Sequence, residues 1–177
     1  MKVVSIIIGS VLLAALAACN SGEHGVKIDM HALTADGVGK KIGTITVSET
    51  AYGTLFKPGL NGLSPGLHGF HLHTNGSCEA GEKDGKVIPG LAAGGHYDPA
   101  NTGAHKGPYG KGHLGDLPAL YADSEGRVDH PVLAPRLKLQ DLAGHALMIH
   151  AGSDNYSDRP LKLGGGGARV ACGVVTK

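Results

Sequence analysis

Short runs of β-forming residues, separated by turn residues, recur from residue 26 to the end of the chain. In residues 44–48, hydroxyl side chains alternate with β-branched apolar ones, the period of a strand with one buried face. Asn61-Gly62 is a turn signal between two such runs, and only 138–144 is suited to a turn of helix. The predicted strands are Val26–Ala32, Lys41–Ser48, Tyr52–Lys57, Gly66–His73, Leu120–Ala122, Arg127–Leu133, Ala146–Ala151 and Ala168–Val175. Several short strands in one domain favour an antiparallel sandwich or barrel.

Composition is consistent with one folded domain. The chain has 177 residues, and its hydrophobic content of 41% is enough for a packed core. Because it has 30 glycines and no tryptophan, that core must be built from aliphatic side chains, with glycine forming the turns. The formal net charge of +1 gives no electrostatic reason to expect a nucleic-acid partner.

The N-terminal segment has the pattern of an export signal. A basic start at Met1–Lys2 precedes an apolar run that ends at Ala18, too short to span a bilayer comfortably. We therefore interpret residues 1–18 as a signal peptide. Leu16-Ala17-Ala18-Cys19 resembles a bacterial lipobox, so we predict lipidation of Cys19 and a polar tether through residue 25, with the folded domain at 26–177. The alternative is a plain signal peptide that happens to contain a cysteine.

The remaining two cysteines form an even pair. If Cys19 carries lipid, Cys78 and Cys172 are left, far apart in the sequence. An exported protein meets an oxidising compartment, where paired cysteines ordinarily form a disulfide. We therefore predict a Cys78–Cys172 bridge; the alternative is two free thiols.

Two histidines on one predicted strand begin a metal-site pattern. His71 and His73 are two residues apart, so their imidazoles point to the same face, whereas His68 points to the other. His150 follows an apolar run at a strand end, a place where side chains often serve sites. The other histidines outside the long loop are expected to be structural or solvated: His24, His31, His130 and His145.

A long stretch without strand pattern, from Cys78 to Pro118, supplies further donors. A loop of this length in a compact domain is usually functional or disordered, and this one is rich in glycine, proline and histidine. Three histidines and an aspartate in it match a closed, four-coordinate zinc site. They are His96, His105, His113 and Asp116. The alternative is a solvated histidine-rich loop with no metal.

Several separate segments resemble one known family, in that family's order. They are GLHGFHLH (66–73), GGHYDP (94–99), GHLGD (112–116) and GGGARVACG (165–173). In these segments the chain resembles the copper,zinc superoxide dismutases, and SDNYSD (153–158) looks like their bacterial periplasmic and lipoprotein branch. The resemblance covers nearly all of the chain after the tether. It implies a Greek-key antiparallel β-barrel of about eight strands, with long metal-binding and electrostatic loops.

The resemblance also implies the role of individual residues. One copper and one zinc ion would be bound per chain, with His96 as the ligand they share. Copper ligands would be His71, His73, His96 and His150, and zinc ligands His96, His105, His113 and Asp116. Asp154 would link His71 to His105, and His68 would be a structural histidine near copper. Arg169 would guide the anion, and Cys78 and Cys172 would be the family disulfide.

The implied activity is dismutation of superoxide to dioxygen and hydrogen peroxide outside the cytoplasm. Copper would cycle between two oxidation states, zinc would be structural, and His96 would relay protons. The protein would be periplasmic, anchored through Cys19 to a bacterial membrane, with the outer membrane favoured, as a monomer or homodimer. Two other classes compete with this reading. A copper-delivery or metal-buffering module would lack ligands or the guide arginine, and a zinc hydrolase needs an open coordination position.

Overall fold

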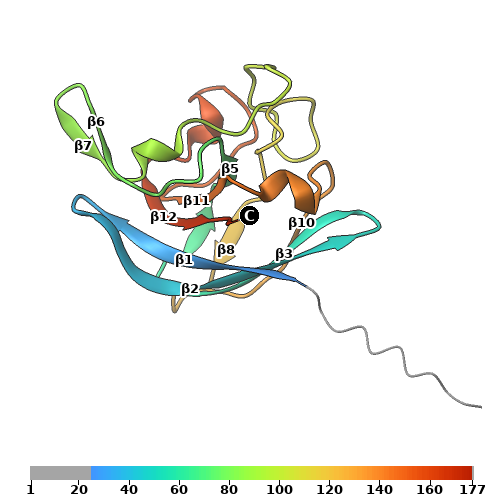
Figure 1. Cartoon of the computed structure of the whole chain (residues 1–177), viewed down its shortest axis with the longest axis horizontal. Helices are drawn as coiled ribbons and strands as arrows, with labels where there is room; N and C mark the ends of the chain where they lie inside the picture. Colours follow the sequence, from blue (N-terminus) through green and yellow to red (C-terminus); the bar gives the residue numbers. More distant parts are fainter. Residues whose placement is uncertain (1–24, 177) are drawn as a thin grey trace, which may run out of the picture.

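The computed structural model describes residues 25–176, which form β-strands and three short 3₁₀ helices (Figure 1). The strands are β1 (Val26–Thr34), β2 (Gly37–Thr50), β3 (Gly53–Asn61), β4 (Gly66–His68), β5 (Phe70–His73), β6 (Gly81–Lys83), β7 (Lys86–Ile88), β8 (Leu120–Ala122), β9 (Arg127–Val128), β10 (Val132–Ala134), β11 (Ala146–His150) and β12 (Arg169–Val174). The 3₁₀ helices are η1 (Leu91–Ala93), η2 (Leu139–Leu142) and η3 (Leu163–Gly165).

One curled antiparallel sheet forms most of the fold. Its neighbours run in the order β10-β3-β2-β1-β12-β11-β5, and β9 also pairs with β3. A second sheet, β4–β8, connects its two ends, because β4 leads into β5 and β8 leads into β9. In Figure 1, β1, β2 and β3 curve beneath β5, β11 and β12. The first strand lies beside the last one, so the predicted all-β Greek-key barrel is confirmed.

The central strands have two different faces. Phe70 and Leu72 of β5, with Leu147 and Ile149 of β11, belong to the main core inside the barrel. Phe70 also meets Phe56 edge to face, with ring centroids 5.4 Å apart. Successive side chains of a strand point to opposite faces, so the residues between these four point outward. The outer face of β5 and β11 lies beneath the long loops, and every residue of both strands is buried.

Three predicted elements differ from the structure. The strand predicted over Arg127–Leu133 is two separate strands, β9 and β10. The strand predicted over Gly66–His73 is divided at Gly69, whose backbone N–H donates to Gly152 O at 2.7 Å. The stretch from Cys78 to Pro118 was predicted to hold no strand, and this is wrong, because it contains the β6–β7 hairpin. Asp84 and Gly85 form its two-residue turn, both with positive φ (53° and 70°). The Asp-Gly pair was a usable signal, but the strands are too polar to show alternation.

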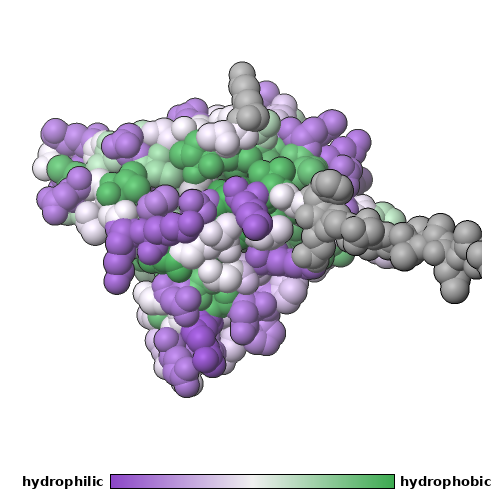
Figure 2. Space-filling model, turned by 60° about the horizontal axis from the view of Figure 1, so that its bottom comes forward, coloured by the Kyte–Doolittle hydropathy of each residue, from purple (hydrophilic) through white to green (hydrophobic). Residues whose placement is uncertain are grey.

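The outer surface is mixed in character. Figure 2 shows apolar side chains in a band across one face, with polar residues on either side. Within residues 25–176, no helix is both long and apolar enough to span a bilayer. The predicted signal peptide, Cys19 and His24 lie outside the described residues.

Candidate metal centre

Four histidines converge on the outer face of the barrel. His71 and His73 come from β5, His150 ends β11, and His96 lies in the loop after η1. Their candidate donor atoms all lie within 4.8 Å of one another, and all four residues are buried. We refer to these four as the histidine cluster. The two-residue spacing within β5 places His71 and His73 on the same face, opposite Phe70 and Leu72.

Each ring of the histidine cluster has one buried nitrogen without a hydrogen-bond partner. These atoms are His71 Nδ1, His73 Nε2, His96 Nε2 and His150 Nε2. Buried polar atoms are almost always paired, so four unpaired nitrogens in one place require an explanation. A metal ion held by imidazoles satisfies all four, and imidazole suits copper. The donor set therefore fits a copper ion.

The second nitrogen of each ring fixes its orientation. For three of the rings these contacts are His71 Nε2 to Asp154 Oδ2 at 2.8 Å, His73 Nδ1 to Gly94 O at 2.9 Å and His150 Nδ1 to Gly167 O at 3.2 Å. The second nitrogen of His96 contacts Asp116. Such partners orient metal-binding histidines. Burial lowers the pKa of His71 to about 3 and that of His150 to about 4. Both rings are therefore neutral at physiological pH and keep a lone pair for a metal.

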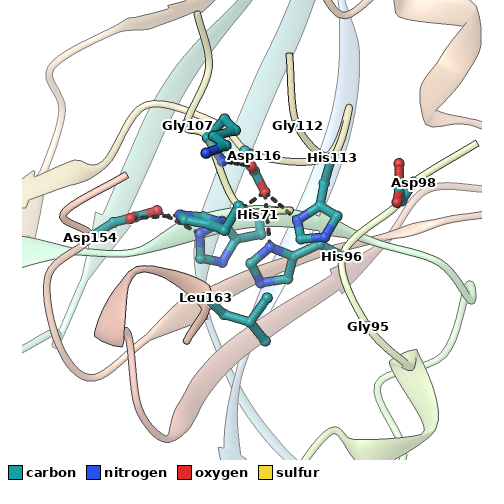
Figure 3. A network of polar contacts seen from close by, with 12 residues as sticks. His71, Gly95, His96, Asp98, Gly107, Gly112, His113, Asp116, Asp154 and Leu163 are labelled. Atoms are coloured by element: carbon teal, nitrogen blue, oxygen red, sulfur yellow. Dashed lines mark hydrogen bonds and ion pairs between the residues drawn. The ribbon is translucent and has the colours of Figure 1, made fainter. Parts of the chain in front are cut away.

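A second cluster surrounds the carboxylate of Asp116. Its Oδ1 lies 3.0 Å from Nδ1 of His96, 3.0 Å from Nδ1 of His105 and 3.1 Å from Nδ1 of His113 (Figure 3). The other carboxylate oxygen accepts the backbone N–H of Lys106 at 2.9 Å. We call these four residues the aspartate cluster. Three imidazoles and one carboxylate form a closed four-donor set, the composition of a structural zinc site.

The electrostatics of the aspartate cluster favour a cation. Burial disfavours the charged imidazole of His105, but hydrogen bonds to Asp116 and Asp154 outweigh it and raise its pKa to about 9. Burial acts against the charged carboxylate of Asp116 too, yet its bonds to His105 and His96 prevail and lower its pKa. A cluster that retains a proton at neutral pH stabilises positive charge at its centre. Zinc would supply that charge in place of the proton.

Two residues connect the clusters. His96 belongs to both, with Nδ1 toward Asp116 and Nε2 among the unpaired nitrogens, and its ring stacks on His71 with centroids 3.9 Å apart. The carboxylate of Asp154 spans them on the other side: Oδ2 is 2.8 Å from His71 Nε2, and Oδ1 is 2.8 Å from His105 Nε2. Figure 3 shows Asp154 beyond His71, away from His113. The two clusters are thus joined by direct side-chain contacts through both residues.

A cavity of about 260 Å³ opens beside the histidine cluster. Its lining includes His73, His96 and His150, together with two cationic side chains, Arg169 and Lys162. Arg169 is the cross-strand neighbour of His150, which explains its position at this cavity. Sequence reasoning did not single out Lys162, because nothing in a loop sequence shows that one lysine faces the cavity.

The guanidinium of Arg169 is held in place by backbone. It donates to the carbonyls of Gly90 and Gly94, which flank η1, with the Gly94 bond at 2.6 Å. Gly94 O also accepts from His73. Burial lowers the pKa of Arg169 below its ordinary value, but a guanidinium starts so high that it stays charged. The arginine therefore offers a fixed positive charge at the cavity.

The other histidines of residues 25–176 lie outside both clusters. His68 uses both ring nitrogens within the barrel, at 2.7 Å from His150 O and 2.7 Å from Ser64 O, so neither is available to a metal. His145 contacts Thr74 O at 2.6 Å, a structural role. His130 is exposed beside Asp129, and His31 is partly buried.

The predicted disulfide is confirmed. Cys78 and Cys172 are bonded, with their Cα atoms 5.7 Å apart. The bridge joins β12 to the loop that follows β5, and it lies in a small apolar cluster with Ala93, Ala146 and Met148. That loop continues to η1 and His96. The bridge therefore links the strand that carries Arg169 to the segment whose carbonyls accept hydrogen bonds from Arg169.

Comparison with known proteins identifies the family. Residues 41–175 match the family model described as copper/zinc superoxide dismutase. The chain belongs to the copper/zinc superoxide dismutase family. Among relatives, it is 58% identical to superoxide dismutase [Cu-Zn] 1 of Salmonella typhimurium, over 95% of this chain and 97% of that protein. It is 50% identical to superoxide dismutase [Cu-Zn] of Escherichia coli, over 93% and 95% of the two chains.

Solved structures give the same result. Copper/zinc superoxide dismutase from Brucella abortus has a TM-score of 0.84 and 53% identity, covering 85% of this chain and 99% of the other. The monomeric copper, zinc superoxide dismutase from Salmonella enterica has a TM-score of 0.78 and 54% identity, covering 86% and 99%. As a copper/zinc superoxide dismutase, the chain is an oxidoreductase whose cofactors are one copper and one zinc ion.

Proposed function

We propose that the histidine cluster holds the copper ion and the aspartate cluster holds the zinc ion, and that the chain dismutates superoxide outside the cytoplasm. The four unpaired buried nitrogens carry this assignment, since they are the atoms that copper would satisfy. Bound copper supplies one-electron redox chemistry, which zinc lacks. Two superoxide ions and two protons then give one dioxygen and one hydrogen peroxide.

The residues around the cavity serve this reaction in different ways. Arg169 and Lys162 present positive charge to a small anion, and a focused field raises its rate of encounter. His96 lines the cavity, its Nδ1 is held by Asp116 and its Nε2 has no hydrogen-bond partner, so we assign to Nε2 the proton delivered to the departing product. Asp154 keeps His71 and His105 aligned.

The donors of the aspartate cluster and the position of Arg169 argue against the two rival functions. A zinc hydrolase needs an open position on zinc, whereas the aspartate cluster offers four protein donors. A metal buffer needs no fixed cation beside its metal, whereas Arg169 is held there by two carbonyls.

Metal analysis of the purified protein, combined with a superoxide assay, tests the proposal. We expect one copper and one zinc per chain, with activity lost on copper removal and restored by copper alone. Zinc without copper, together with hydrolytic activity, would contradict it. Bound copper without dismutation would support the buffering function instead.

A prediction concerns location. We infer that Cys19 is lipidated and anchors the protein on the periplasmic side of a bacterial membrane, on the basis of the apolar run and the sequence before this cysteine. Acyl chains bind membranes by about 0.8 kcal/mol per buried methylene. Cys19→Ala should therefore move the protein from the membrane to the soluble fraction. Mass spectrometry of the wild-type protein showing no lipid would refute the anchor.

A second prediction concerns Arg169. Arg169→Ala should lower the rate of superoxide capture by about tenfold, the lower end of the range for electrostatic steering, with both metals retained. Arg169→Lys should keep much of the rate, because attraction at a distance depends on charge. Salt screens charges over about 10 Å at 0.1 M, so activity of the alanine variant should depend less on ionic strength. An alanine variant with wild-type rate and salt dependence would make Arg169 a strand residue only.

A further inference from the structure

Arg136 contacts the loop that carries the aspartate cluster, although it belongs to neither cluster. Its guanidinium donates to four backbone carbonyls, all within residues 107–113. These bonds are Nε to Pro108 O at 3.0 Å, Nη1 to Gly112 O at 3.2 Å, Nη2 to Gly107 O at 3.3 Å and Nη2 to His113 O at 2.6 Å. Within residues 25–176 the guanidinium forms no ion pair, and its hydrogen-bond partners are these four backbone carbonyls. Arginine suits this task because its donors form a rigid planar fork.

The base of Arg136 is fixed on the barrel. It follows β10, which pairs with β3. The next residue, Leu137, is 1% exposed, and its carbonyl accepts a hydrogen bond from the buried hydroxyl of Thr54 at 2.7 Å. The side chain therefore extends from a rigid position toward the loop.

The loop segment that Arg136 contacts lies outside the hydrophobic core, so polar and local contacts must order it. None of the residues 107–113 belongs to a hydrophobic core cluster of the described chain. The segment includes three glycines, one of which, Gly107, has a φ of +65°. Figure 3 shows the backbone at Gly107 and Gly112 beside Asp116 and His113. Glycine-rich backbone loses much conformational freedom on ordering, so a segment of this kind needs external contacts.

We propose that Arg136 is a positioning residue that orders the 107–113 segment and thereby sets zinc affinity. The inference rests on the proposed zinc site. Arg136 binds the carbonyl of His113, while His113 N–H donates to Ala104 O at 2.9 Å, so both backbone polar groups of this residue are held. It also binds Gly107, two residues after His105, so it fixes the spacing between two donors. Without the guanidinium, the donors must be ordered by the metal itself, and binding is weakened.

The test compares Arg136→Ala and Arg136→Lys with two reference variants. Lys111→Ala removes one positive charge from an exposed position in the same segment, and His113→Ala removes a donor. Zinc and copper affinities are measured by chelator competition on the metal-free proteins, with thermal unfolding as a check of folding. Visible spectra with Co²⁺ in place of zinc report donor geometry.

We expect Arg136→Ala to weaken zinc binding by about 10-fold or more, the range found when partners of metal ligands are removed. Copper affinity should change less, and the Co²⁺ spectrum should broaden or shift. Arg136→Lys should be intermediate because it keeps the charge but loses the fork, and Lys111→Ala should match wild type.

Three results would overturn the inference. The first is an unchanged zinc affinity in both Arg136 variants. The second is an equal loss of zinc and copper affinity together with a lower unfolding temperature of the metal-free protein, which would indicate a general loss of folding. The third is a loss of zinc affinity in Lys111→Ala as large as that in Arg136→Ala. A failure of the proposed zinc site appears differently, because His113→Ala would then bind zinc as wild type does.

Discussion

Replacing His73 with alanine is expected to lower superoxide dismutase activity to the level of the copper-free protein. His73 is 1% exposed and supplies one of the four unpaired nitrogens, so its loss leaves three donors and an empty volume beside them. It also removes the bond to Gly94 O, the carbonyl that holds Arg169. Copper should be lost and zinc retained, because no atom of His73 belongs to the aspartate cluster. Copper and zinc content, measured together with activity, checks this result.

The matched control for this variant is His130→Ala. His130 is exposed beside Asp129 and lies outside both clusters, so its removal should leave metals and activity unchanged. A His73→Ala protein that keeps one copper per chain and wild-type activity would remove His73 from the copper site. Equal loss of both metals would show that His73 supports the whole centre instead of copper alone.

Replacing both Cys78 and Cys172 with alanine is expected to lower the unfolding temperature by about 10–20 °C. The bridge joins residues 94 positions apart, and closing a loop of that length stabilises a protein by about 4–5 kcal/mol in the chain-entropy view. For a domain of this size, each kcal/mol shifts the midpoint by about 2–4 °C. Activity should fall as well, since the bridge connects the strand of Arg169 to the loop carrying Gly90 and Gly94. Calorimetry of the fully metallated proteins measures the shift.

Reduced wild-type protein is the control for the effect of the substitutions themselves. Cys172 is fully buried, so alanine leaves a small cavity there, whereas reduction breaks the bond and keeps the sulfur atoms. Both proteins should lose stability, with the double variant somewhat lower. Unchanged unfolding temperatures in both would show that the metals, and not the bridge, hold this loop.

Much of the site was predictable because its information is local. Period two places His71 and His73 on one face, and the structure has them on the outer face of β5, opposite Phe70 and Leu72. The same alternation places His68 on the other face, where its ring nitrogens contact the backbone carbonyls of His150 and Ser64. The four donors of the aspartate cluster were predicted from the composition of the long loop, and the expected division of ligands between copper and zinc came from a resemblance in several separate motifs. The β6–β7 hairpin was missed because its polar strands show no alternation, and only Asp84-Gly85 indicated a turn.

The sequence alone determined the strand-rich pattern, the segments that carry donors and the cysteine pair, because each depends on residue type and spacing within a short stretch or on a motif. The tertiary structure decided which nitrogen of each histidine is left unpaired, since that depends on partners as distant as Asp154 and Gly167. It alone placed Lys162 at the cavity and Arg136 against the loop that carries the aspartate cluster. A loop without hydrophobic periodicity has no local rule for the direction of its side chains. Contacts between segments far apart in the chain set that direction, and they exist only once the barrel has formed.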